Sequence, residues 1–296
     1  MKRLPFLTLA GILAIALLTT TTGCPKKDEP APKPDDKGAK GDKGAKDKGG
    51  KMEALAKNWD AVVKGKVTYN GEPPTMPAIK GISEDKFKPV CEAGAKDFEK
   101  VQQTWMVGKD KAVKNAVIWL KPPAKKYFVV KDEDKKRTDT VVLEQPHCAF
   151  IPHVFVLYPS YYDGKDHVKT GQIFKVINNA SALHNSKIQG EQGINEPQNI
   201  SLPPTKEKEV DLAPQKSKIT VNCDIHPWMS AYGWVFEHPY AAVTGEDGTF
   251  EIKNVPADVE LFVVGWHEGT EFFEKGKAMT FKKGDNTVPE FKIKAQ

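Results

Sequence analysis

The segment Cys223-Asp224-Ile225-His226-Pro227-Trp228-Met229 is the most informative part of this 296-residue chain. It lies between two segments, 217–221 and 232–236, whose β-branched and aromatic residues predict strands. A thiol, an imidazole and a thioether therefore lie on one tight loop between two strands. All three side chains are potential metal ligands, so the stretch predicts a metal site at one end of a β-sheet.

The loop supplies one histidine, and a second lies at the end of an upstream predicted strand, in Val176-Ile177-Asn178-Asn179-Ala180-Ser181-Ala182-Leu183-His184-Asn185. Thiolate and thioether favour Cu(I), whereas imidazole suits both oxidation states of copper. Two histidines and one cysteine in a trigonal set, with methionine as a weak axial ligand, allow electron transfer with little rearrangement. A zinc site from Cys223, His184 and His226 is an alternative that leaves Met229 unexplained. A buried cysteine with an incidental histidine and methionine is another.

An Asn six residues before a His-Asn pair, followed about 40 residues later by Cys-x-x-His-Pro-aromatic-Met, resembles the amicyanin branch of the cupredoxins. The resemblance implies a Greek-key β-sandwich that holds one type 1 copper ion. The copper ligands that it implies are His184, Cys223, His226 and Met229.

The resemblance also implies roles for side chains beside the ligands. Asn185 would hold the cysteine loop in place through hydrogen bonds. In the family, electrons leave through the exposed edge of the loop histidine, and here Pro227 and Trp228 would supply the apolar patch around His226. The alternative is that Trp228 is simply a core residue. The implied function is a one-electron carrier that meets a redox donor and a redox acceptor transiently.

Short β-rich segments separated by Gly, Pro, Asn and Asp continue from residue 61 to the C-terminus and predict an all-β fold of the sandwich type. Only 83–102 has helical character. The predicted strands are 62–69, 116–120, 138–143, 154–157, 172–177, 217–221, 232–236, 249–252 and 259–264.

The two ends of this region carry a different pattern. The segments 65–73, 115–120 and 244–256, the last with its Asp-Gly-x-Phe-x-Ile turn and strand, together resemble the carboxypeptidase regulatory-like, or transthyretin-like, β-sandwich. We therefore predict a cupredoxin domain inserted in, or fused to, such a sandwich, a combination similar to exported bacterial proteins labelled methylamine-utilisation proteins. A single elaborated sandwich is the alternative. The predicted boundaries are 59–122 and 238–296 for the split sandwich and 123–237 for the cupredoxin domain.

The N-terminus predicts export. A basic start, an apolar stretch and small residues before Cys24 are typical of a cleaved signal, residues 1–23. Thr22-Gly23-Cys24 resembles the lipobox of bacterial lipoproteins, which implies that Cys24 carries lipid and anchors the chain to the outer membrane, on its periplasmic side or at the cell surface. A signal peptide cut elsewhere is the alternative. Residues 24–58 are rich in Lys, Gly and Pro and predict a disordered tether.

The formal net charge of +5 belongs to this N-terminal part, because residues from Asn58 onward hold 32 basic and 32 acidic side chains. A neutral body without a basic stripe argues against nucleic acid as a partner. No Ser/His/Asp arrangement, phosphate-binding glycine loop or paired His-x-His motif stands out. We therefore expect a protein that is not an enzyme.

Four cysteines in an exported chain raise the question of a disulfide. With one cysteine acylated and one bound to metal, Cys91 and Cys148 remain, and an oxidising compartment favours their pairing. The alternative is a second metal centre from His147, Cys148 and His153. Neighbouring residues on a strand point to opposite faces, which makes it difficult for His147 and Cys148 to share an ion.

These observations together predict a membrane-tethered type 1 copper protein that carries single electrons in the periplasm or at the cell surface. Copper binding for sensing, delivery or storage is the alternative that keeps the metal. A scaffold or adhesion β-sandwich with a vestigial site is the alternative that does not.

Overall fold

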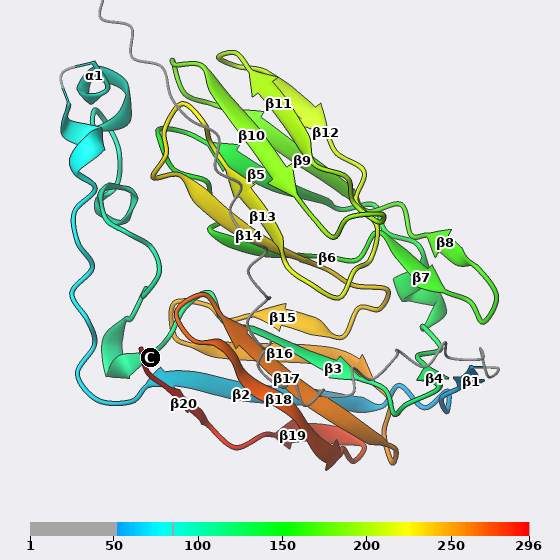
Figure 1. Cartoon of the computed structure of the whole chain (residues 1–296). Coiled ribbons are helices and arrows are strands. Elements are labelled where there is room, and N and C mark those ends of the chain that lie inside the picture. The colour runs from blue at the N-terminus through cyan, green and yellow to red at the C-terminus, as the bar shows by residue number, and fades with distance from the viewer. Residues whose placement is uncertain (1–51, 85, 296) are drawn as a thin grey trace, which may run out of the picture. The chain divides into compact units, whose positions relative to one another are not determined.

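The structure, a computed structural model, describes residues 52–84 and 86–295. The regular structure of these residues consists of strands and a few short helical turns, which confirms the all-β prediction (Figure 1). The segment 83–102, predicted to be helical, forms only isolated turns. None of the helices in the described part of the chain is long and apolar enough to cross a membrane. The helical turns are η1 (Lys80–Ser83), α1 (Lys88–Cys91), η2 (Asp97–Lys100), η3 (Lys109–Lys111) and η4 (Asp132–Lys135).

One β-sandwich, called here the inner sandwich, is built from the middle of the chain. Its strands are β5 (Thr140–Gln145), β6 (Val154–Leu157), β9 (Ile173–Asn178), β10 (His184–Gln189), β11 (Gln198–Leu202), β12 (Glu207–Glu209), β13 (Ile219–Asn222) and β14 (Ser230–Val235). The larger sheet has the order β11-β10-β13-β14-β6 and the smaller one β12-β9-β5. The chain crosses between these sheets after β5, on both sides of β9 and on both sides of β12, as Greek-key connections do.

The two sheets pack through the alternate side chains of their strands. Phe155 of β6 and Phe174 of β9 stack with their ring centroids 4.9 Å apart. Gly233 of β14 lies against Phe155, where a Cβ atom would come within 2.4 Å of the ring. Cys223 and Met229 belong to the same buried cluster. The core of the inner sandwich therefore extends into the loop that carries the metal donors.

A second β-sandwich, the outer sandwich, is built from both ends of the described region. Its strands are β2 (Ala61–Tyr69), β3 (Val117–Lys121), β15 (Ala241–Val243), β16 (Thr249–Val255), β17 (Glu260–His267), β18 (Glu271–Thr280), β19 (Gly284–Thr287) and β20 (Phe291–Ile293). One sheet has the order β15-β3-β17-β18, and the other β16-β2-β19 with β20 also paired to β2. In Figure 1 the blue strand β2 accordingly lies among orange and red strands, whereas green and yellow strands form the inner sandwich. The chain leaves the outer sandwich after β3 and returns to it at β15.

Strands β3 and β14 each contribute to two buried clusters, because their side chains alternate between faces. Ile118 of β3 faces the core of the outer sandwich, whereas the neighbouring Trp119 joins a separate aromatic cluster. In that cluster the Trp119 and Trp234 ring centroids are 4.7 Å apart, and those of Trp234 and Trp266 are 5.7 Å apart. Buried tryptophans from β3, β14 and β17 therefore join the two sandwiches.

Residues 52–58, the last part of the predicted tether 24–58, are folded. β1 (Glu53–Ala54) pairs in parallel with β4 (Lys126–Tyr127), and Leu55 is buried in the core of the outer sandwich. Leu55 therefore gives this segment an apolar packing contact with the outer sandwich. The predicted export signal, Cys24 and the tether up to residue 51 lie outside the described residues.

The predicted boundary at residue 123 also differs from the structure. Phe128 packs in the core of the outer sandwich, with its ring centroid 4.6 Å from that of Tyr240. The first strand of the inner sandwich begins at Thr140. Farther along, β7 (Ser160–Tyr162) and β8 (His167–Lys169) form a separate two-stranded ribbon.

One part of the connection between β2 and β3 packs onto the inner sandwich. We name residues 79–84 and 86–100 the cover; in Figure 1 it is the cyan segment that carries α1. A backbone bridge between Ala78 and Val101 closes its base. Cys91 of the cover is buried in the core of the inner sandwich. Residues of the cover, which the predicted boundaries assign to the outer sandwich (59–122), therefore contribute to the core of the inner sandwich.

Candidate metal centre

The loop between β13 and β14 is closed by its own backbone. The N–H of Met229 donates to the carbonyl of His226 at 2.9 Å, and the N–H of Cys223 donates to the carbonyl of Met229 at 3.4 Å. This closure turns the His226 side chain toward Cys223, so that its Nδ1 lies 3.7 Å from Sγ. Two of the predicted donors therefore meet because the loop is tight.

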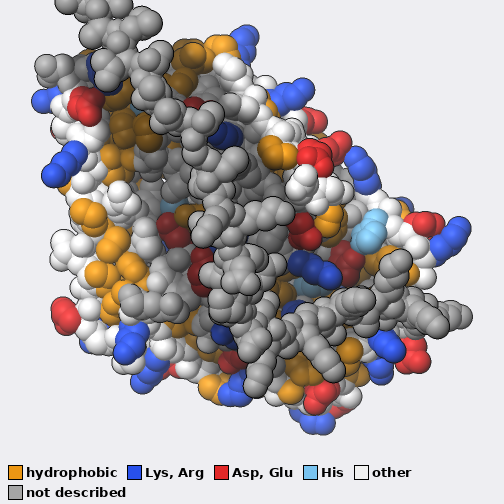
Figure 2. Space-filling view, in the orientation of Figure 1, with side chains coloured by type: hydrophobic (Ala, Val, Ile, Leu, Met, Phe, Trp, Pro, Cys, Tyr) orange, Lys and Arg blue, Asp and Glu red, His pale blue; other side chains and the backbone are white. Residues whose placement is uncertain are grey.

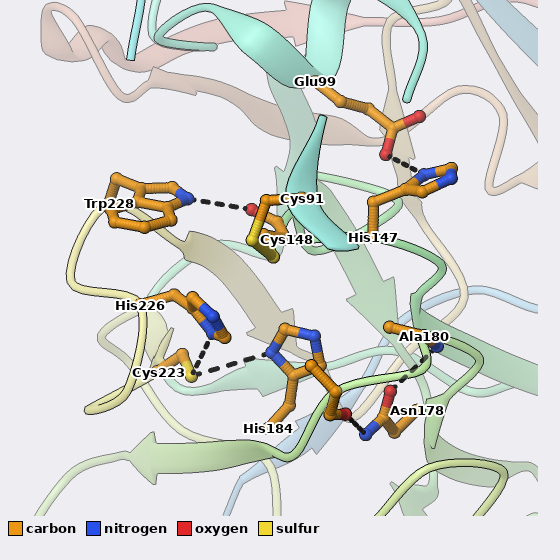
Figure 3. Close-up of a disulfide and its surroundings, with 11 residues drawn as sticks. Cys91, Glu99, His147, Cys148, Asn178, Ala180, His184, Cys223, His226 and Trp228 are labelled. Atoms are coloured by element: carbon orange, nitrogen blue, oxygen red, sulfur yellow. Dashed lines mark hydrogen bonds and ion pairs between the residues drawn. A yellow bond between two sulfur atoms is a disulfide. The ribbon is translucent and has the colours of Figure 1, made fainter. Parts of the chain in front are cut away.

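The second histidine comes from the first residue of β10, which pairs with β13 in the same sheet. His184 Nδ1 lies 3.9 Å from Cys223 Sγ, and the two imidazole rings have centroids 4.6 Å apart. The turn before His184 is held by Asn178, whose side chain donates to the Ala182 carbonyl and accepts from the Ala180 N–H (Figure 3). The Asn that lies six residues before the histidine thus shapes the turn that places it.

Burial keeps both imidazoles neutral. It lowers the pKa of His184 to about 4, with a further contribution from the adjacent His226. Burial also lowers the pKa of His226 below its ordinary value. A neutral imidazole has a free lone pair, so both rings can act as metal ligands at neutral pH.

Asn185 connects the two segments that carry the donors. Its Oδ1 accepts a hydrogen bond from the Asp224 N–H at 2.8 Å and one from the Cys223 thiol at 3.3 Å. Its Nδ2 donates to Asn199 Oδ1 at 2.7 Å. One amide therefore ties β10 to the start of the cysteine loop.

The donor atoms are spaced as a metal ion requires. An ion at about 2.0 Å from imidazole nitrogen and about 2.3 Å from a thiolate needs these atoms roughly 3.5 to 4 Å apart, and the two Nδ1–Sγ distances are 3.7 and 3.9 Å. His184, Cys223 and His226 form a group whose ligand atoms all lie within 4.8 Å of one another. Met229, the fourth predicted ligand, is buried at the end of the same loop.

The exposed histidine edge expected from the resemblance is absent. His226 is only 2% exposed. Its ring centroid lies 4.9 Å from that of Phe87 in the cover and 5.3 Å from that of Trp228. Trp228 is half-buried against the cover, where a Cβ atom on Gly81 would come within 2.4 Å of the indole ring. Pro227 is exposed, so it alone of the two predicted patch residues lies fully at the surface.

Cys91 and Cys148 form a disulfide. It links α1 of the cover to the turn after β5, and the Trp228 Nε1–H donates to the Cys148 carbonyl at 3.1 Å (Figure 3). The sequence predicts this disulfide but does not predict that it lies beside the metal loop. The pairing of a cysteine in 79–100 with Cys148 was the one sequence signal that could have brought Phe87 to the site.

The alternative second centre from His147, Cys148 and His153 is not formed. His147 Nδ1 lies 2.8 Å from Glu99 Oε2, and His153 Nε2 lies 2.7 Å from Glu268 Oε2. The two imidazoles turn to carboxylates on different segments, while the cysteine between them in sequence is in the disulfide. A water-sized cavity of about 30 Å³ is lined by His153 and Met229 among other residues.

No protein-family model and no curated protein matches the chain. Among solved structures, 33% of the chain is similar to a copper-containing nitrite reductase from Thermus scotoductus SA-01, with 17% identity and a TM-score of 0.27. The chain spans 22% of that reductase. A purple cupredoxin from Nitrosopumilus maritimus is also similar over 33% of the chain, with 13% identity and a TM-score of 0.24, and 98% of the cupredoxin is covered.

Proposed function

We propose that this chain is a copper protein in which His184, Cys223, His226 and Met229 hold one type 1 copper ion. The observation that carries the proposal is the convergence of two neutral imidazole nitrogens on one buried sulfur, at 3.9 and 3.7 Å. Two imidazoles, one thiolate and a weak thioether are the ligands of type 1 copper. Zinc accepts the first three donors but gives Met229 no role.

The chain's own residues account for what such a site needs. Asn185 accepts hydrogen bonds from the cysteine loop, which limits the movement of Cys223. The core of the inner sandwich and the cover bury the two histidines and the cysteine, so water is excluded from the donors. Copper bound there would supply a one-electron couple. A rigid, dry donor set keeps its geometry when the charge of the metal changes, which favours electron transfer.

The test is the colour of the copper-loaded chain. Thiolate bound to Cu(II) in a trigonal site gives an intense visible charge-transfer band and a compressed hyperfine splitting in the magnetic resonance spectrum, because the unpaired electron is shared with sulfur. We expect both in the Cu(II) protein with its disulfide intact, and we expect Cys223→Ser to abolish both. Cu(II) protein without visible colour, or colour that survives Cys223→Ser, would refute the site.

The proposal extends to the physiological setting. We propose that the protein carries single electrons between a donor and an acceptor in the periplasm or at the cell surface, anchored by lipid on Cys24. Redox partners of this kind meet through small, transient contacts. On the face that Figure 2 shows, Lys and Arg side chains are interspersed with Asp and Glu side chains, which is unlike a surface for nucleic acid.

One observation favours a second candidate, the holding and delivery of copper. The loop histidine through which electrons were expected to leave lies under the cover, with Phe87 against its ring. A covered ligand slows contact with partners and also slows loss of the metal. Electron self-exchange of the copper protein measured by magnetic resonance favours the carrier if it is fast. Copper transfer to an apo-acceptor without measurable self-exchange favours delivery.

A further inference from the structure

The disulfide lies beside the candidate metal centre and forms a second group of donors with it. Among the described residues, Cys91, Cys148 and His226 bring their ligand atoms within 4.8 Å of one another. All three are buried, Cys91 at 0%, Cys148 at 1% and His226 at 2% exposure. In Figure 3 the two sulfurs lie with Trp228 and the His226 ring on one side and the turn that carries His147 on the other. His226 thus belongs to two groups of potential ligands.

The three donors come from three separate segments that the fold brings together. Cys91 ends the single turn α1 of the cover, Cys148 lies in the turn after β5, and His226 is on the loop between β13 and β14. Trp228 ties the second of these segments to the third through its hydrogen bond to the Cys148 carbonyl at 3.1 Å. Phe87 packs on both His226 and Trp228. These contacts do not pass through the disulfide bond, so they hold the segments together when it is opened.

The surroundings favour a soft metal ion. The ligand group contains two sulfurs and one imidazole and no carboxylate. Its neighbours Phe87 and Trp228 are aromatic, and the nearby Glu99 is engaged by His147 at 2.8 Å. Thiolates select Cu(I) over harder ions, and the apolar surroundings do not offer the oxygen ligands that Mg²⁺ or Ca²⁺ need.

We propose that Cys91 and Cys148 in their dithiol form, together with His226, are a binding site for Cu(I), and that the disulfide is the closed form of this site. A phosphine with one water, or a dithiol, opens it by two-electron reduction and the S–S bond breaks. The water or the dithiol gives one proton to each sulfur, and the reductant becomes a phosphine oxide, which takes the water oxygen, or a disulfide. Cu(I) then displaces the two thiol protons and binds two thiolates and one imidazole nitrogen. The proposal rests on the proposed function only in sharing His226 with the type 1 site.

Sharing His226 makes the two sites alternatives for one copper ion. A neutral imidazole offers a single lone pair at a time, so His226 serves either Cys223 or the cysteine pair. Copper bound first at the dithiol would lie next to the type 1 ligands and could pass to them as His226 changes partner. Cys91 ends the single helical turn α1, whose Lys88 and Pro89 are exposed. The dithiol site therefore lies nearer to solvent on that side than the type 1 site does.

The experiment separates the dithiol site of Cys91, Cys148 and His226 from the type 1 site by replacing Cys223. Anaerobic Cys223→Ser protein is prepared with the disulfide intact and after phosphine reduction, and each form competes for Cu(I) with the chromogenic chelator bicinchoninate. We expect the reduced form to bind one Cu(I) at least 10-fold more tightly than the oxidised form. With Cys91→Ser and Cys148→Ser added, phosphine treatment should no longer change the affinity. With His226→Gly added instead, the reduced form should bind about 10-fold more weakly.

Equal Cu(I) affinity in the reduced and oxidised forms would overturn the proposal. Undiminished affinity with His226→Gly would also overturn it, because the thiols would then bind copper alone. Circular dichroism checks that the variants keep their fold. If Cys223→Ser does not fold, His184→Asn replaces it as the background variant. The type 1 proposal fails separately, on a colourless Cu(II) protein whose disulfide is intact.

Discussion

Oδ1 of Asn185 accepts a hydrogen bond of 2.8 Å from the backbone N–H of Asp224, the residue that follows Cys223. The contact joins the segment that carries His184 to the loop that carries the other three predicted ligands. It places no atom on the metal, yet it determines how far Cys223 can move from His184. The geometry of the site therefore depends on this amide as well as on the donors.

Replacing this amide should weaken copper binding while leaving the fold intact. We expect Asn185→Leu to lower the copper affinity about 10- to 100-fold, the usual effect of losing a residue that orients a metal ligand. Competition with a chelator measures it. Asn199→Ala is the matched control, because Asn199 contacts Asn185 and Asp224 only through exposed or half-buried side-chain atoms. Equal losses in the two variants would show that Asn185 has no special role.

The axial ligand should tune the copper without being essential for its colour. Met229→Leu removes a weak donor, so we expect the visible band to remain and the reduction potential to rise. Voltammetry and a visible spectrum of the same sample measure both. His147→Ala and His153→Ala should leave the spectrum unchanged, since these imidazoles bind Glu99 and Glu268. Loss of colour in either histidine variant would contradict the assignment of ligands.

The aromatic cluster between the sandwiches should make them unfold together. We expect Trp234→Ala to lower the free energy of unfolding by about 3 to 5 kcal/mol, as truncation of a buried aromatic residue does. Urea unfolding followed by circular dichroism should show one transition in the wild type. Phe272→Ala is the control, because Phe272 is 40% exposed at the edge of the cluster and should cost about 1 kcal/mol or less. Two well-separated transitions in the wild type would contradict this coupling.

Acid should destabilise the fold partly through a histidine remote from the metal centre. Burial lowers the pKa of His238 to about 3, and its Nδ1 accepts a hydrogen bond from the Tyr240 N–H at 3.2 Å. The unfolded chain, with a histidine pKa near its ordinary value, binds this proton at a higher pH than the folded chain. The stabilising contribution is therefore complete above about pH 6.5 and is lost as the pH falls toward 3.

His238→Asn keeps a side-chain acceptor but cannot take up a proton. Between pH 7 and pH 4.5 we expect the free energy of unfolding to fall by on the order of 2 kcal/mol less in this variant than in the wild type. Urea unfolding at the two pH values measures the difference. Parallel losses in the two proteins would show that His238 does not contribute to the acid sensitivity.

The lipid anchor is tested at Cys24. Cys24→Ser removes the proposed acylation site, so the protein should move from the membrane fraction to the soluble fraction. The copper spectrum should stay the same, because the change is far from the ligands in sequence. A variant that still fractionates with membranes would argue against a lipid on Cys24.

Residues that are neighbours along the chain account for the part of the site that the sequence predicts. Cys223, His226 and Met229 lie within seven residues, and the loop closes on itself through backbone hydrogen bonds. His184 is predicted because its spacing from Asn178 resembles the amicyanin pattern, and the structure shows that Asn178 shapes the turn before it. The strands were predicted because alternating apolar side chains are a local pattern, and the structure places 154–157 where the pattern did.

The position of the cover could not be read in this way. Residues 79–100 contain few large apolar side chains and no regular period, so nothing local shows that Cys91 is buried in the core of the inner sandwich. The sequence alone determined the type of fold, the donor set and the turns that present it, because these depend on residues close together along the chain. Only the tertiary structure decided that Phe87 and the disulfide enclose His226, because that contact joins segments more than 70 residues apart whose packing depends on both sandwiches being complete.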